Sequence, residues 1–286
     1  MKENKYLFQK LDFNGLKTLI KWAAIEGWDP GKYDDDVYWA TDHDGFYGYF
    51  KDDELIAGGS IISYNGEFGF MGFFIVKPEY RSLGIGRKLW YQRRDILLSR
   101  LKEGASIGMD GVVEMQSFYE KGGFKLAFRD VRYEKTGMEF DVHENISSIK
   151  ENDFEMILKY DNQCFGFSRP QFLKPWLNTP NTKKFKYIEN YKLKGFCIVR
   201  KTPEGYKTGP LFADNEIIAE ELYKACLNSV VGEKLFLDIP LINKGAINII
   251  EKYNASYVFE CGRMYYGNPP NIDMNKVFGI TTFELG

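Results

Sequence analysis

Apolar residues in the first half of the chain alternate between helical spacing and strand-like apolar runs. Residues 14–26 repeat apolar side chains at helical spacing, and Asn14 can cap the helix that this pattern predicts. Phe68–Val76 is apolar throughout, as expected of a central strand buried on both faces. The full pattern predicts a strand at 6–11, a helix at 14–26, strands at 46–51, 55–63 and 68–76, a helix from 85, a strand at 106–113, a short helix at 116–121 and a strand at 124–133. This order is typical of an α/β fold, a mixed sheet with helices on both faces.

The second half of the chain repeats the same order of elements. Residues 135–152 are polar, and we place a domain boundary there, which divides the chain into residues 1–136 and 137–286. Beyond it the pattern predicts a helix at 153–162, strands at 185–189, 193–200 and 206–212, a helix at 216–227, a strand at 234–239, a helix at 244–253 and a strand at 257–265. A diverged internal duplication, with two α/β domains in tandem, is the simplest interpretation.

Composition narrows the classes of function. The 286 residues carry a formal net charge of −2, which disfavours a dedicated nucleic-acid-binding protein. The longest apolar stretch is about half the length of a membrane-spanning helix, and residues 1–6 lack the apolar core of a secretion signal. Four scattered cysteines and two histidines disfavour a disulfide framework and a metal centre. We therefore expect a cytoplasmic protein with no metal, nucleic-acid or membrane partner, and its oligomeric state is left open.

The strand at 68–76 leads through a glycine-bearing turn, residues 81–86, into the helix that follows. A strand–turn–helix of this kind aims free backbone N–H groups and the positive end of the helix at one spot, which suits a pyrophosphate. Gly84 and Gly86 let the backbone approach phosphate oxygens closely. Between residues 81 and 102, seven basic side chains accompany a single acid, Asp95, and these are Arg81, Arg87, Lys88, Arg93, Arg94, Arg100 and Lys102. We interpret this local excess of positive charge as an anion site.

Two common phosphate loops do not fit the turn. The pattern G-x-x-x-x-G-K-[ST] is absent, and G-x-G-x-x-G fails because Leu89 stands at its third glycine. What remains is [RQ]-x-x-G-x-[GA], filled as Arg81-x-x-Gly84-x-Gly86 directly after a strand. This resembles the acetyl-CoA-binding motif of the GNAT N-acetyltransferases, and the resemblance in element order covers about residues 6–134. The whole chain is similar to bacterial two-domain GNAT proteins with a diverged second copy.

The resemblance implies which residues contact acetyl-CoA. In GNAT enzymes the pantetheine arm runs along the strand before the loop, and the loop binds the pyrophosphate. Carried onto this sequence, the contacts fall on Phe74, Ile75, Val76, Arg81, Ser82, Leu83, Gly84, Ile85, Gly86 and Arg87. A family tyrosine that protonates the departing CoA thiolate has its counterpart in Tyr119, within the stretch 117–124. The alternative for Tyr119 is a packed side chain, one of 19 tyrosines.

The residue that takes the proton from the acceptor amine is harder to assign. The resemblance implies a carboxylate on the central strands, but residues 69–76 contain no acid. Glu67 lies just before that strand, and Asp110 lies on the next one. We assign the role to Asp110, although its counterpart in the second half, Asp238, favours a structural role for both.

The second half lacks both parts of the predicted site. Ala213-Asp214-Asn215-Glu216 stands where the glycine turn would be, and its two acids would repel phosphate. Ile250 takes the place of Tyr119. We therefore predict that acetyl-CoA binds once per chain, in the first half.

These inferences predict an N-acetyltransferase that passes the acetyl group of acetyl-CoA, its co-substrate, directly to a small-molecule primary amine in a ternary complex. The alternatives are acetylation of a protein or peptide, and a non-catalytic acyl-CoA-binding module. Asp34, Asp35, Asp36, Asp42 and Asp44 form an acidic loop that would favour a cationic acceptor if it borders the site. The same aspartates could instead cap a helix or face water.

Overall fold

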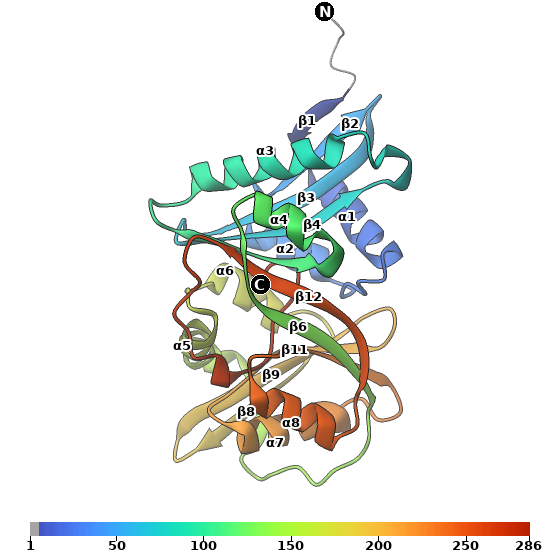
Figure 1. The fold of residues 1–286 in the computed structure, drawn as a ribbon. Coiled ribbons are helices and arrows are strands. Elements are labelled where there is room, and N and C mark those ends of the chain that lie inside the picture. Colours follow the sequence, from blue (N-terminus) through green and yellow to red (C-terminus); the bar gives the residue numbers. More distant parts are fainter. Residues whose placement is uncertain (1–5) are drawn as a thin grey trace, which may run out of the picture.

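The computed structural model describes residues 6–286, and Figure 1 shows its two halves joined by long strands. The first half contains β1 (Leu7–Lys10), α1 (Phe13–Ile25), α2 (Asp34–Thr41), β2 (Phe46–Lys51), β3 (Glu54–Tyr64), β4 (Phe68–Val76), α3 (Ile85–Arg100), β5 (Ser106–Val112), α4 (Gln116–Lys121) and β6 (Lys125–Thr136). The second contains β7 (Ile146–Ser148), α5 (Phe154–Phe165), α6 (Pro170–Leu177), β8 (Lys183–Glu189), β9 (Lys192–Lys201), β10 (Tyr206–Ala213), α7 (Glu216–Asn228), β11 (Lys234–Pro240), α8 (Lys244–Lys252), β12 (Ser256–Tyr266) and β13 (Val277–Gly279). Across residues 6–286, no helix combines the length and the apolar character that a membrane span requires.

The predicted α/β class is confirmed, and the helices lie on both faces of the sheet. Side chains of α3 and α4 pack with Ile61 and Met71 on one face, while α1 and α2 pack with Ile62 on the other. The core on the α1–α2 side continues without a break to α5 and α6 of the second half. A shared apolar core therefore binds the two halves together.

One helix was missed by the sequence analysis. α6 contains Pro170 and Pro175, residues that normally argue against a helix interior. Pro170 stands in the first turn, where no backbone N–H is needed, and α6 buries Phe172, Leu173 and Trp176 on one face. Packing of that apolar face outweighs the cost of the internal proline.

The two halves exchange their last long strands. All strands belong to a single sheet whose order is β1-β2-β3-β4-β5-β12-β6-β11-β10-β9-β8-β7, with β13 beside β10. β12 thus pairs with β5 of the first half, and β6 pairs with β11 of the second (Figure 1). The sequence analysis predicted a strand at 124–133 but not its partner, because the two copies are duplicates and no local pattern tells a strand which copy to join.

A buried ion pair stands at the same place in each exchanged ladder. Arg263 of β12 lies opposite Asp110 of β5, and its Nε and Nη2 donate to the two carboxylate oxygens at 2.6 and 2.7 Å. Arg132 of β6 lies opposite Asp238 of β11 and makes the same pair of bonds at 2.6 and 2.7 Å. Two-pronged arginine–carboxylate pairs of this kind fix orientation as well as charge. They therefore specify the register of the exchanged strands.

The inner strands of each half separate part of the way along. β4 pairs with β5 only through Phe68–Met71, which leaves a first slot between residues 72–76 and 110–112. β10 pairs with β11 only over residues 206–208, but there β13 enters the second slot and pairs with Leu211 and Phe212. The N–H of Ile280 then donates to the carbonyl of Asp238 at 2.9 Å. The chain itself therefore fills the second slot, whereas the first remains open.

Removing the buried Arg263–Asp110 pair should destabilise the fold far more than removing a partly exposed pair between the long strands. Arg263→Ala should lower the free energy of unfolding by about 3–5 kcal/mol, because it leaves the buried Asp110 carboxylate without its cation. The matched control is Arg129→Ala, which removes the half-exposed Arg129–Glu260 pair between β6 and β12 and should cost about 1 kcal/mol or less. Urea unfolding followed by circular dichroism measures both, and equal losses would contradict the prediction.

Candidate active site

A groove of about 580 Å³ opens from the first slot to the surface. Eight of the ten residues that the sequence predicted for acetyl-CoA line it, namely Phe74, Ile75, Val76, Arg81, Ser82, Gly84, Gly86 and Arg87. Leu83 is exposed and lies outside the lining, and Ile85 is buried beneath α3 against Ile56 and Leu89. The fold thus brings the predicted strand and turn together along one groove.

Gly84 shapes the end of the groove. It precedes α3 with φ of +79°, a left-handed conformation that glycine adopts without strain, and a Cβ there would meet nothing within 4 Å. The first N–H groups of α3 have no intrahelical acceptor and face outward at this turn. The loop therefore offers an open, positively polarised surface of backbone donors.

The positive charge of this region is less concentrated than the sequence suggested. Of the seven basic residues counted between 81 and 102, Arg81 and Arg87 line the groove. Arg81 is anchored there, since its Nε donates to the Val76 carbonyl at 2.9 Å and its Nη2 to Glu26 at 2.5 Å. Others are paired elsewhere, for example Arg100 with Asp42. Spacing along a helix could not show this, because the partners lie on other elements.

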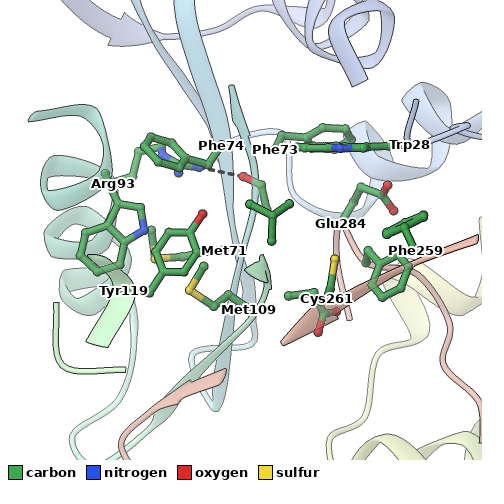
Figure 2. Close-up of a pocket in the computed structure, with 15 residues that line it drawn as sticks. Trp28, Met71, Phe73, Phe74, Arg93, Met109, Tyr119, Phe259, Cys261 and Glu284 are labelled. Carbon is green, nitrogen blue, oxygen red and sulfur yellow. Dashed lines mark hydrogen bonds between the residues drawn. The ribbon is translucent and has the colours of Figure 1, made fainter. Parts of the chain in front are cut away.

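Tyr119 stands where the groove meets a smaller inner cavity, and its side chain contributes to both. Its ring packs edge-on against Phe74 and stacks on Trp90, with 6.4 and 6.0 Å between centroids. Figure 2 shows the hydroxyl pointing into the cavity. Burial raises the pKa of Tyr119, and the positive charge of Arg93 opposes that shift. The hydroxyl is thus a protonated donor at neutral pH.

The inner cavity has a volume of about 60 Å³ and walls from both halves of the chain. The first half contributes Trp28, Met71, Gly72, Phe73, Phe74, Trp90, Arg93, Met109, Asp110, Val112 and Tyr119. The second contributes Phe259 and Cys261 of β12 together with Phe283 and Glu284 of the segment that follows β13 (Figure 2). A Cβ on Gly72 would lie 2.1 Å from the carbonyl oxygen of Glu284, so this segment lies directly against β4.

Arg93 is a residue of the site whose position the sequence analysis missed. It is 1% exposed, and its Nη1 donates to the carbonyls of Ser60 and Gly72 at 2.9 and 2.8 Å. Burial lowers the pKa of its guanidinium to about 9. The signal was available, because Arg93 continues the row of Leu89 and Leu97 at spacings of four on the buried face of α3.

Asp110 and Glu284 are the carboxylates that line the cavity. Both oxygens of Asp110 accept from Arg263, as described above, and burial raises its pKa against that charge. Glu284 accepts from the hydroxyls of Thr282 and Tyr38, the latter at 3.4 Å. Within residues 6–286, Glu284 has no lysine or arginine at ion-pair distance. Sequence reasoning had no signal for Glu284, because the segment after β13 brings it against β4, more than 200 positions away in the sequence.

The acidic loop does not border the groove or the cavity. Asp34, Asp35 and Asp36 form the first turn of α2, and Asp34 is buried in an ion pair with Arg200 of β9. Asp42 pairs with Arg100, and Asp44 with Lys10. Of the two interpretations that the sequence left open, this placement favours the structural one.

Known proteins resemble this chain in both halves. A model described as the acetyltransferase (GNAT) family matches residues 13–124, and one described as an acetyltransferase (GNAT) domain matches residues 157–279. Holothin acyltransferase of Pseudoalteromonas sp. (strain SANK 73390) is 29% identical over 268 residues, covering 93% of this chain and 90% of its own. The uncharacterized N-acetyltransferase YitH of Bacillus subtilis is 24% identical over 239 residues, 81% of each chain.

Solved structures share the fold over the whole length. A protein of Pyrococcus horikoshii classed provisionally as an acetyltransferase superposes with a TM-score of 0.84 at 22% identity, covering 100% of this chain and 98% of that one. A tandem GNAT protein from the clavulanic acid biosynthesis pathway gives a TM-score of 0.64 at 11% identity, over 92% and 99% of the two chains. With a GNAT match in each half and GNAT-fold neighbours along its length, the chain belongs to the GNAT family of acyltransferases.

Proposed function

We propose that this protein transfers an acetyl group from acetyl-CoA to the primary amine of a small molecule, directly and within a ternary complex. One observation carries the proposal, namely that the groove and the closed cavity meet at the Tyr119 side chain. A donor in the groove and an acceptor in the cavity would then face each other across one hydroxyl. Proximity of two bound reactants is itself a large part of such catalysis.

The groove has the features that CoA binding requires. Backbone of Phe74–Val76 lines it, the start of α3 offers free N–H groups, and Arg81 and Arg87 supply positive charge. When bound, acetyl-CoA supplies the thioester that is the acetyl source. The residues of the first slot would hold its pantetheine arm, and Gly84 and Gly86 its pyrophosphate. The second slot offers no such place, since β13 occupies it.

Tyr119 is the proton donor in this proposal. Its hydroxyl lies at the junction, protonated because burial raises its pKa. Arg93 assists, since a nearby positive charge favours the phenolate that proton donation leaves behind. Arg93 also holds the carbonyls of Ser60 and Gly72, which keeps β3 and β4 in place beside the slot.

A carboxylate of the cavity would accept the proton of the amine. The sequence assigned this role to Asp110, and that assignment stays a prediction, since Asp110 does line the cavity. Its two oxygens are engaged by Arg263, which stabilises the charged form and weakens it as a base. Glu284 accepts from hydroxyls only and is the freer of the two carboxylates.

The partly enclosed shape of the cavity favours a small molecule over a protein acceptor. A peptide needs an open groove, whereas β12 and the segment 280–286 cover this cavity. The related holothin acyltransferase is named for a single acceptor, which supports a dedicated acceptor site. Four buried free cysteines support the cytoplasmic location that we propose.

Release of free CoA with and without added acceptors tests the proposed function. Small primary amines should accelerate thiol release from acetyl-CoA, and the initial-rate lines should intersect, as for a ternary complex. A panel of peptides with free N-termini and lysines serves as the comparison. Acetylation of peptides alone, or tight acetyl-CoA binding with no transfer to any amine, would overturn the proposal.

Removal of the Tyr119 hydroxyl should slow the chemical step selectively. We expect Tyr119→Phe to lower kcat by roughly 10²-fold or more, with the Kd of acetyl-CoA little changed, because the hydroxyl matters only as the thiolate leaves. Tyr223→Phe is the matched control, since Tyr223 is equally buried in the second half. Retention of the parental kcat by Tyr119→Phe, with chemistry shown to limit the rate, would exclude the role.

A negative charge at the turn should weaken acetyl-CoA binding strongly. Calorimetric titration of the parent should give one acetyl-CoA per chain, and Gly84→Asp should weaken it by at least about tenfold. Gly104→Asp is the matched control, because Gly104 has φ of +80° and equally open surroundings but lies away from the groove. Two sites per chain, or equal binding by both variants, would contradict the assignment.

A further inference from the structure

The walls of the inner cavity are aromatic and sulfur-bearing. Six rings and three sulfur atoms line it, from Trp28, Phe73, Phe74, Trp90, Phe259, Phe283, Met71, Met109 and Cys261, with the ring of Tyr119 at the mouth. Aromatic faces and edges gain specific contacts with another ring, and methionine sulfur packs well against ring edges. These aromatic and sulfur-bearing walls favour a flat apolar group, and only a few polar groups, those of Arg93, Asp110, Tyr119 and Glu284, also line the cavity.

The size of the cavity limits the acceptor. A volume of about 60 Å³ holds about four to six water molecules, close to the bulk of one six-membered ring. A linear polyamine extends well beyond the size of one ring, and an aminosugar carries several further substituents on its ring, so both exceed this volume. A single ring with one short substituent does.

The charged groups of the cavity determine where the amino group of an acceptor would bind. Glu284 and Asp110 provide carboxylates, and the Asp110 charge is balanced by Arg263, whereas Glu284 is held by hydroxyls alone. Arg93 lies under Phe74 beside Tyr119, with 5.4 Å between its guanidinium carbon and the Phe74 ring centroid. Glu284 is therefore the carboxylate left to pair with one amino group, because Arg263 already balances the charge of Asp110.

We propose that the acceptor is a primary amine carried on one compact aromatic ring, with no other charged group. This deepens the proposed function and rests on it, because the cavity is taken as the acceptor half of the site. It does not use the acidic loop, which the sequence analysis took to favour a cationic acceptor if it borders the site, since Asp34 and its neighbours do not reach the cavity.

A matched panel of amines tests the class of acceptor. Benzylamine stands for the proposed class, and spermidine, glucosamine and lysine stand for the cationic and polar alternatives. With acetyl-CoA saturating and free CoA as the readout, benzylamine should show kcat/KM at least tenfold above each of the others. Preference for spermidine, glucosamine or lysine would overturn the proposal.

A pair of cysteine variants locates the acceptor. Cys261→Ala enlarges the cavity wall on β12, so the ratio of kcat/KM for tryptamine, which has two fused rings, to that for benzylamine should rise several-fold. Cys197→Ala is the matched control, because Cys197 is buried in the second-half core away from the cavity. A ratio of two rate constants does not depend on how much of each variant is folded. An unchanged ratio in Cys261→Ala would overturn the placement.

Calorimetry with benzylamine and the enzyme–CoA complex separates the two levels of the proposal. Binding of benzylamine that Cys261→Ala alters, without acetyl transfer to any amine, would support the acceptor class as a ligand class and overturn the proposed transfer. Acetylation of spermidine or glucosamine with no binding of benzylamine would overturn the acceptor class and leave the transfer standing. Neither binding nor turnover of any amine would overturn both.

Discussion

The exchange of strands β6 and β12 between the two halves is the constraint on which the rest of this structure depends. It turns two similar sheets into one and places a charged residue of each half opposite its partner in the other. Asp110 and Asp238 could not stay buried as carboxylates without Arg263 and Arg132, which arrive from distant parts of the chain. The apolar core shared by α1, α2, α5 and α6 then closes around the joined sheet.

The exchange explains why a second half without a phosphate loop is retained. Phe259 and Cys261 are on β12, and Phe283 and Glu284 follow β13, so the second half builds one wall of the inner cavity. β13 also fills the slot that corresponds to the open one between β4 and β5. The first half thus retains the open groove, and the second half contributes one wall of the inner cavity next to it.

The sequence pattern predicted the parts of the candidate site that lie within single local elements. Arg81–Gly86 and Tyr119 lie within one strand–turn–helix and one short helix, and most of these residues line one groove, although Leu83 and Ile85 do not. Arg93 could have been recognised from its row with Leu89 and Leu97, but its charge concealed its buried position. Glu284 and the Asp110–Arg263 pair could not be foreseen, because contacts between residues more than 150 positions apart follow from the tertiary topology and not from local spacing.

The exchange also sets an order of events during synthesis. β5 ends at Val112, but its neighbour β12 begins at Ser256, so for about 7 to 30 seconds of translation at 5–20 residues per second that edge of β5 lacks its final partner. An unpaired edge of this kind invites pairing with other chains. The last wall of the cavity is therefore synthesised well after the strands and turn of the groove.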